Sequence, residues 1–233
     1  SYFYPSKFNH AVQAMRQIGS SVNPFIYTAA LEKGFTAASV INDAPVVFQD
    51  AALEGAWRPE NYGSEFNGPT RLREALVNSM NLVSIRLLRA ISIGYALESL
   101  NRFGFNGALM PHDLTLALGS GQLSPLELAG GFTVFANGGY KVDTYFIQRI
   151  EDMNGKVIFE ADPIVACVPC EMKKRGKPMP ATVDATLETG LPKQAGRVVE
   201  DRIMYVMNSM LQDVVNRGTA RRARALGRND LMG

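Results

Sequence analysis

Ser20 stands at the start of an apolar stretch, in a position where a hydroxyl can serve as a nucleophile. Apolar residues recur after it with the spacing of one helix face, and they are Val22, Phe25, Ile26, Ala29 and Ala30. This pattern predicts a helix from about Ser20 to Glu32 that packs against a core. Pro24 suits an early helical position. We therefore expect Ser20 at the positive end of the helix dipole, with Asn23 one turn later on the same face.

Short motifs that follow one another along the chain carry a family resemblance. They are Gly19-Ser20-x-x-x-Pro24-Phe25, Trp57-Arg58-Pro59-Glu60-Asn61, Ser79-Met80-Asn81 and Ala117-Leu118-Gly119-Ser120-Gly121-Gln122. Together they resemble the transpeptidase domain of class A, bifunctional penicillin-binding proteins. The motifs of that family read Ser-x-x-Lys, Ser-x-Asn and Lys-Thr-Gly. Ser20 matches the nucleophile, and Ser79 and Asn81 match the second motif.

The resemblance implies a reaction and a role for each matching residue. In the family, a serine attacks a D-alanyl-D-alanine stem peptide, forms an acyl-enzyme and passes the acyl group to an amine, which cross-links peptidoglycan. β-Lactams mimic that substrate. Ser20 is thus the expected nucleophile, Ser79 a proton relay, and Asn81 a residue that binds the substrate amide. Trp57 is either a weak candidate for a substrate platform or an anchor of a long loop. No cofactor is implied.

Two departures from the family bear on this chemistry. Position 23, where the family has its general-base lysine, is Asn23, and the sequence stops at Gly233, where Lys-Thr-Gly would be expected next. A serine needs a base to remove its proton, and an amide cannot do so. Losing a general base costs about 10² to 10⁴ in rate. The sequence therefore predicts a nearly inactive copy, and a natural change, an engineered change and a sequence error at Asn23 all stay open.

Two other classes of function stay open beside the enzyme. In the first, the chain is a catalytically inactive module of the same fold that binds peptidoglycan or a partner without acylation. In the second, it is a structural helical domain in which Ser20 is only an N-cap, worth about 1 kcal/mol to its helix.

Composition limits the partners. The chain has 233 residues, 46% of them hydrophobic, and a net charge of +2, which argues against nucleic acid as a general partner. No apolar run reaches the length of a membrane span, and the first residues do not form a signal peptide. Any membrane attachment is therefore expected through segments outside this sequence. The resemblance implies the periplasmic face of the bacterial inner membrane, with stem peptides and β-lactams as ligands; the oligomeric state is not predicted.

The two cysteines, Cys167 and Cys170, form a Cys-x-x-Cys pair. One such pair is half a zinc site, and His10 and His112 are distant in sequence, so no metal site is predicted. For a periplasmic protein a local disulfide is the favoured interpretation. A pair of free thiols is the alternative.

The remaining pattern predicts mostly helix with one hairpin. Helices are expected near 71–78, 81–90, 95–103, 126–136 and 203–214. Gly104 is expected to end the third of these helices, and Gly218 the last. Ser124 and Glu127 form a capping box before one of them. Asn154-Gly155 predicts a type I′ hairpin between strands 145–150 and 156–160. Turn formers predict an irregular surface loop over 38–69.

These elements and the resemblance together imply the fold class. The resemblance implies an α/β (α+β) serine β-lactamase/D,D-peptidase-like transpeptidase fold, in which this chain supplies mostly the helical lobe and one hairpin, with the central sheet incomplete. Residues 1–233 are expected to be one partial transpeptidase domain. The stretch 164–197 is rich in Lys, Arg and Pro, which predicts an excursion that is either exposed or disordered.

Overall fold

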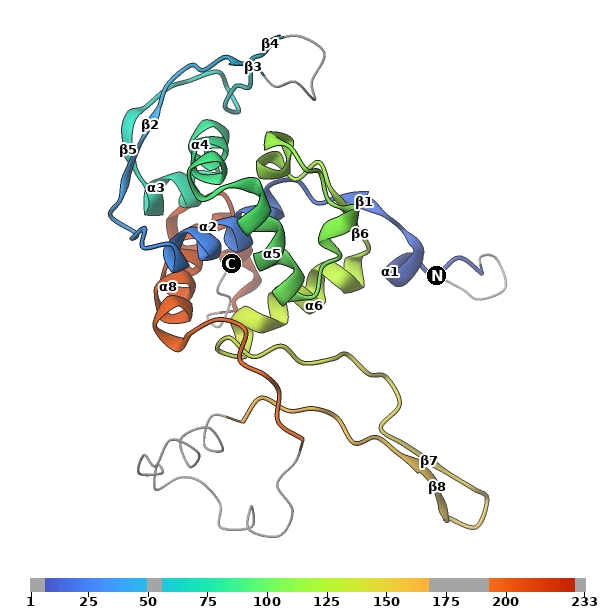
Figure 1. The fold of residues 1–233 in the computed structure, drawn as a ribbon. Coiled ribbons are helices and arrows are strands. Elements are labelled where there is room, and N and C mark those ends of the chain that lie inside the picture. Colours follow the sequence, from blue (N-terminus) through green and yellow to red (C-terminus); the bar gives the residue numbers. More distant parts are fainter. Residues whose placement is uncertain (1–6, 50–55, 168–192, 229–233) are drawn as a thin grey trace, which may run out of the picture.

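A computed structural model describes residues 7–49, 56–167 and 193–228. Helices form the body of the molecule, and a β-hairpin projects from it (Figure 1). In chain order the elements are α1 (His10–Gln13), β1 (Arg16–Gln17), a 3₁₀ turn (Gly19–Val22), α2 (Asn23–Glu32), β2 (Val40–Asp43), β3 (Phe48–Gln49), β4 (Ala56–Trp57), β5 (Gly68–Arg71), α3 (Leu72–Val77), α4 (Asn81–Ile91), α5 (Ile93–Phe103), 3₁₀ turns (Gly107–Leu109 and Leu114–Leu118), β6 (Gln122–Leu123), α6 (Pro125–Ala136), β7 (Arg149–Glu151), β8 (Val157–Glu160), α8 (Asp201–Arg217) and a last 3₁₀ turn (Arg221–Leu226).

The helix α2 lies at the centre of the body, in contact with α4, α5 and α8 (Figure 1). Every residue from Asn23 to Leu31 is buried, although the sequence pattern predicted only one face of this helix against the core. Phe25 lies at the middle of an aromatic cluster, with its ring centroid 4.9 Å from that of Phe103 and 4.8 Å from that of Phe105. The predicted core helix is confirmed, although its α-helical part begins at Asn23 and Ser20 lies in the 3₁₀ turn before it.

Local sequence patterns predicted several helix ends correctly. Helix α5 ends at Gly104, which adopts the left-handed conformation with φ +98°. Helix α6 begins with a complete capping box, in which the Ser124 side chain binds the Glu127 backbone and the Glu127 side chain binds the Ser124 backbone. Helix α8 ends at Gly218. These ends depend on neighbouring residues only, which is why the sequence predicts them.

The strands of the described residues pair only in twos. The antiparallel pairs are β1 with β6, β2 with β5, β3 with β4, and β7 with β8. Within residues 7–49, 56–167 and 193–228 there is no larger sheet. The predicted fold, a helical lobe with a hairpin and an incomplete central sheet, agrees with this arrangement.

The prediction of an irregular loop over 38–69 is wrong. Strand β2 pairs with β5 from Val40 opposite Arg71 to Asp43 opposite Gly68, and a second short ladder joins β3 to β4. The partners of the first ladder are separated by a long segment, so local turn propensity gives no sign of their pairing. Asp43, at the end of the ladder, is fully buried.

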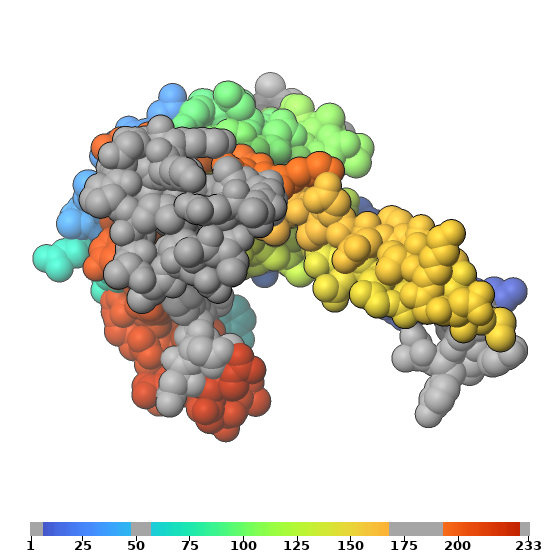
Figure 2. All heavy atoms as spheres, turned by 90° about the horizontal axis from the view of Figure 1, so that it is seen from below, coloured from blue at the N-terminus to red at the C-terminus, as the bar shows by residue number. Residues whose placement is uncertain are grey.

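The hairpin between β7 and β8 is confirmed, but its predicted turn type is wrong. A type I′ turn needs positive φ at both central residues, whereas only Gly155 has positive φ, at +78°. The carboxylate of Asp152 accepts hydrogen bonds from the backbone N–H groups of Asn154 (2.8 Å) and Lys156 (2.9 Å), which fixes the different turn. The first strand is also shorter than predicted. The hairpin extends away from the body and is exposed on both faces (Figure 2).

The two ends of the predicted excursion over 164–197 are hydrogen-bonded together. Val165 N–H donates to the carbonyl oxygen of Lys193, and Ala195 N–H donates to the carbonyl oxygen of Val165, both at 2.8 Å. Residues 168–192 lie outside the described residues. Cys167 is disulfide-bonded, and Cys170 falls outside the described residues.

The described residues contain neither a metal-binding cluster nor a membrane-spanning helix. Among these residues, no group of three or more His, Cys, Asp or Glu side chains is placed to hold a metal ion. None of the helices in the described part of the chain has the length and apolar character needed to cross a membrane.

Candidate active site

Ser20 is exposed in the 3₁₀ turn that leads into the buried helix α2. Its hydroxyl has no hydrogen-bond partner among the described residues. The residue that caps α2 is Val22, which makes no side-chain capping bond. The interpretation of Ser20 as an N-cap is therefore wrong, and its hydroxyl is available to a ligand.

The backbone before Ser20 is hydrogen-bonded to the loop that contains the Gly119-Ser120-Gly121 motif. The ladder of β1 and β6 continues past both strands, because Ile18 N–H donates to the Gly121 carbonyl oxygen (3.1 Å) and Gly19 N–H to the Gly119 carbonyl oxygen (3.0 Å). Gly119 has φ +69°, and a Cβ atom there would lie 1.9 Å from the carbonyl oxygen of Gly19. Only glycine permits this approach. Two motifs that are 100 positions apart thus meet directly through their backbones.

Asn23 begins α2 and is 2% exposed. Its side-chain oxygen Oδ1 is buried and has no hydrogen-bond partner in the described part of the chain. Because a buried polar atom usually has a partner, this orphaned acceptor marks position 23 as a poor place for an amide.

Ser79 lies in the turn between α3 and α4, as the sequence predicted. Its φ is +53°, a left-handed conformation that is costly for a residue with a Cβ atom and is typical of functional sites. Its side chain is half-buried beside a polar pocket of about 310 Å³. The pocket is lined by Asn61, Tyr62, Glu65, Asn67, Asn78, Ser79 and Met80.

The loop that contains Trp57 is tied to this turn. Asn81 donates through Nδ2 to the carbonyl oxygen of Glu60 (2.9 Å), and Asn61 Oδ1 accepts from the backbone N–H of Leu82 (3.2 Å). Asn61 in turn donates to the buried carboxylate of Asp43 (2.7 Å). Trp57 is partly buried against the hydrophobic core, which agrees with a loop anchor; its use as a substrate platform stays a prediction.

A buried pair of hydroxyls connects α2 to the turn. Tyr27 Oη lies 3.3 Å from Ser84 Oγ, and Ser84 donates to the carbonyl oxygen of Met80 (3.0 Å). Burial raises the pKa of the Tyr27 phenol well above its usual range; the hydrogen bond with Ser84 opposes this shift, and the charge of Asp43 adds to it. The phenol therefore stays protonated.

The structure thus joins the predicted motifs by hydrogen bonds. The motif of Ser20 meets the loop of Gly119, and the turn of Ser79 and Asn81 meets the Trp57 loop. Sequence reasoning missed Tyr27, Ser84 and Asp43, which add further hydrogen bonds to these connections. One signal was present for Ser84, a serine between the apolar residues Val83 and Ile85 of a predicted helix, where a buried polar side chain needs a partner.

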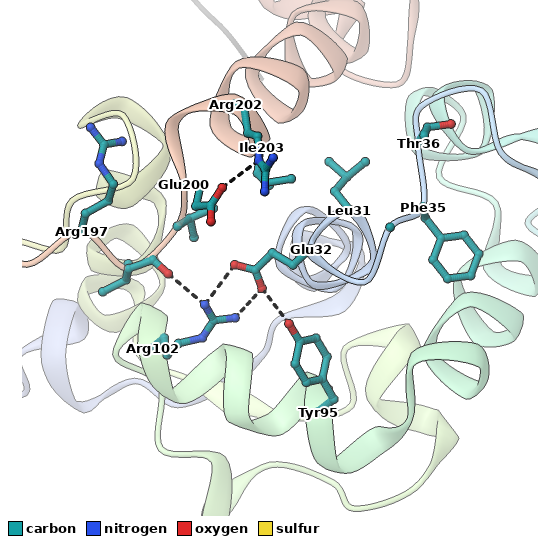
Figure 3. Close-up of a pocket in the computed structure, with 13 residues that line it drawn as sticks. Leu31, Glu32, Phe35, Thr36, Tyr95, Arg102, Arg197, Glu200, Arg202 and Ile203 are labelled. Atoms are coloured by element: carbon teal, nitrogen blue, oxygen red, sulfur yellow. Dashed lines mark hydrogen bonds and ion pairs between the residues drawn. The ribbon is translucent and has the colours of Figure 1, made fainter.

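A larger pocket, of about 780 Å³, lies at the other end of α2 (Figure 3). Arg102 donates to both carboxylate oxygens of Glu32, and Tyr95 O–H donates to the same carboxylate (3.2 Å). Burial and the charge of Glu32 raise the pKa of Tyr95, and the hydrogen bond with Glu32 raises that of Arg102. Glu32 is the last residue of a ten-residue helix, about 15 Å long. This pocket is therefore separate from the Ser20 site.

The fold is that of the transpeptidase domain of penicillin-binding proteins. The structure matches penicillin-binding protein 1A from Haemophilus influenzae with a TM-score of 0.85 and 34% identity, over 98% of this chain and 35% of that chain. It also matches penicillin-binding protein A from M. tuberculosis, solved as an imipenem acyl-enzyme complex, with a TM-score of 0.66, over 90% of this chain and 46% of that chain. At 16% identity, this second match shows the fold alone.

Sequence comparison identifies the family. The profile of the penicillin binding protein transpeptidase domain matches residues 3–229, and the chain belongs to this family. Penicillin-binding protein 1A of Pseudomonas aeruginosa is 45% identical over 99% of the chain, and that of Neisseria meningitidis serogroup A is 42% identical over 99%. The chain spans 30% and 26% of the lengths of these relatives. The resemblance drawn from the motifs is confirmed.

Proposed function

We propose that this chain is the serine-bearing part of a peptidoglycan D,D-transpeptidase. Ser20 Oγ bonds to the carbonyl carbon of a D-alanyl-D-alanine stem peptide, the bond to the terminal D-alanine breaks, and the departing amine takes up a proton. An amine of a second stem peptide then attacks the acyl-enzyme and releases Ser20. The observation that carries the proposal is the exposed hydroxyl of Ser20, which has no partner among the described residues and lies in the turn that leads into the buried helix α2.

The proposal gives the other site residues the roles that the family resemblance implies. Ser79 relays the proton from its turn, and Asn81 binds the substrate amide. β-Lactams are expected to acylate the same serine. In this proposal the protein works on the periplasmic face of the inner membrane.

The same proposal includes an impaired reaction in the chain as it stands. Asn23 has no basic nitrogen, so the proton of Ser20 has no acceptor at that position. Loss of the base corresponds to about 10² to 10⁴ in rate. The buried Oδ1 of Asn23, without a partner in the described residues, supports a position suited to a different side chain.

Asn23 also favours a second candidate function. An inactive module of the same fold would bind stem peptides or a partner protein without forming a covalent bond. It predicts saturable binding of stem peptides and no adduct on Ser20 with any residue at position 23.

Intact-mass measurement after incubation with a penicillin tests both candidates. The complete gene product is compared as it stands and as Asn23→Lys, with Ser20→Ala and the exposed neighbour Ser21→Ala as controls. The transpeptidase proposal predicts an adduct in Asn23→Lys that Ser20→Ala abolishes and Ser21→Ala keeps. An equal rate of adduct formation with Asn23 would refute the impairment, and no adduct in Asn23→Lys would favour the binding module.

A further inference from the structure

We propose that Tyr27 is a positioning residue, which fixes the turn of Ser79 and Asn81 relative to the nucleophile helix through Ser84. The inference rests on the proposed function, because it assigns these residues to one reaction. In this proposal Tyr27 does not touch the reacting atoms. It acts through the backbone of the second motif.

The hydrogen-bond geometry sets the direction of the link. The carbonyl oxygen of Met80 only accepts, so the single hydroxyl hydrogen of Ser84 points to it at 3.0 Å. Ser84 Oγ then has only its lone pairs for Tyr27, and the phenol donates to it at 3.3 Å. The result is an oriented chain from α2, through α4, to the middle residue of the Ser79-Met80-Asn81 turn. Hydrogen bonds arranged in such a chain strengthen one another.

Burial strengthens this hydrogen-bonded link between α2 and α4. Tyr27 is 1% exposed and Ser84 is fully buried, so water does not compete for either hydroxyl. An unsatisfied buried hydroxyl is costly. The two helices are therefore held in the relative position at which both hydroxyls are paired.

The turn itself needs such support. Ser79 has φ +53°, a conformation that persists only where the surrounding structure imposes it. The Met80 carbonyl oxygen also accepts the backbone N–H of Ser84 at 3.2 Å. The hydroxyl of Ser84 thus makes a second hydrogen bond to the same acceptor. Through it, Tyr27 on α2 is linked to Met80, the residue next to Ser79.

The test measures acylation of the Asn23→Lys protein by a fluorescent penicillin over a range of concentrations. Tyr27→Phe and Ser84→Ala are each expected to lower the limiting acylation rate by about 3- to 10-fold, the range of one net hydrogen bond. The half-saturating concentration should change little. The double variant should lose no more than the larger single loss, because both changes break one link. The pH profile should keep its shape, because the phenol moves no proton.

Thr28→Val is the matched control. Thr28 is also fully buried on α2, but its hydroxyl donates to the Pro24 carbonyl oxygen within the same helix, at 2.7 Å. This variant should lower the unfolding midpoint as Tyr27→Phe does, while leaving the acylation rate unchanged. If the Asn23→Lys protein is acylated at the same rate with and without Tyr27→Phe, the positioning role is overturned and the proposed function stands. An Asn23→Lys protein that forms no adduct would refute the proposed function, and the positioning role with it.

Discussion

Replacing Gly119 by alanine should push apart the two backbone segments that meet at Gly19 and Gly119, next to Ser20. The new Cβ atom would lie 1.9 Å from the Gly19 carbonyl oxygen, 2.4 Å from its carbonyl carbon and 2.5 Å from its nitrogen. Real Cβ contacts are essentially never shorter than 3.0 Å, so the two backbones must separate by at least about 1 Å. The bond from Gly19 N–H to Gly119 (3.0 Å) cannot survive that separation.

The expected cost combines three effects. The left-handed conformation of an alanine at φ +69° costs about 1–2 kcal/mol, overpacking about 1–3 kcal/mol and the lost hydrogen bond about 1 kcal/mol. Gly119→Ala should therefore lower the free energy of unfolding by about 3–6 kcal/mol, a large part of the total for a typical domain. A shift of about 1 Å in the serine should also lower acylation of the Asn23→Lys protein by about 10²-fold.

Gly19→Ala is the matched control. Gly19 has φ +54°, but no heavy atom lies within 4 Å of the place where its Cβ would be. This variant pays only the conformational cost of about 1–2 kcal/mol. Urea unfolding of both variants at one pH measures the difference. Equal unfolding free energies for Gly119→Ala and Gly19→Ala would show that the close approach is not a constraint in solution and would refute the argument.

Two further predictions concern the body and an exposed ion-pair network. Phe25→Ala should lower the free energy of unfolding by about 3–5 kcal/mol in urea, because it empties the centre of the aromatic cluster, whereas the exposed Phe8→Ala should cost under about 0.5 kcal/mol. Hydrogen bonds from Arg217 lower the pKa of Glu74; burial raises the pKa of Asp213, but hydrogen bonds from arginines outweigh it and the net shift is down. These carboxylates therefore stabilise the fold above the unfolded-state pKa near 4, and that stabilisation is lost as pH falls through the folded-state pKa. Unfolding midpoints measured between pH 6 and pH 3 should fall more steeply in the unchanged protein than in Arg217→Gln; parallel curves would contradict this.

The sequence predicted those parts of the fold that depend on near neighbours. The capping box at Ser124 and the left-handed end at Gly104 involve residues within one turn, and the buried stripe of α8 follows from helical periodicity. It failed for β2 and β5, because a strand containing Asn42 and Asp43 becomes a strand only through its distant partner. It also failed for the hairpin turn, where the Asp152 carboxylate binds two backbone donors and overrides the preference of Asn-Gly.

The candidate site shows the same division. The sequence predicts Ser20, Ser79 and Asn81 as site residues because the proposed chemistry restricts their residue types and spacing. Tyr27 and Ser84 are 57 positions apart, and each alone is an ordinary residue of a buried helix. The residues that position a site are selected by three-dimensional contacts, so a local pattern shows at most that Ser84 needs a buried partner and does not show which residue that partner is.

The hydrogen bonds that hold the backbone around Ser20 do not depend on the residue at position 23. The bond between Gly19 and Gly119 and the link from Tyr27 to Ser84 both form without any atom of the Asn23 side chain. The orphaned oxygen of Asn23, unpartnered within the described residues, costs about 1–3 kcal/mol as an unsatisfied buried group. Under the proposed function, this amide therefore costs stability and supplies no base. Because these hydrogen bonds do not involve the side chain at position 23, Asn23→Lys tests the chemistry without changing the rest of the site.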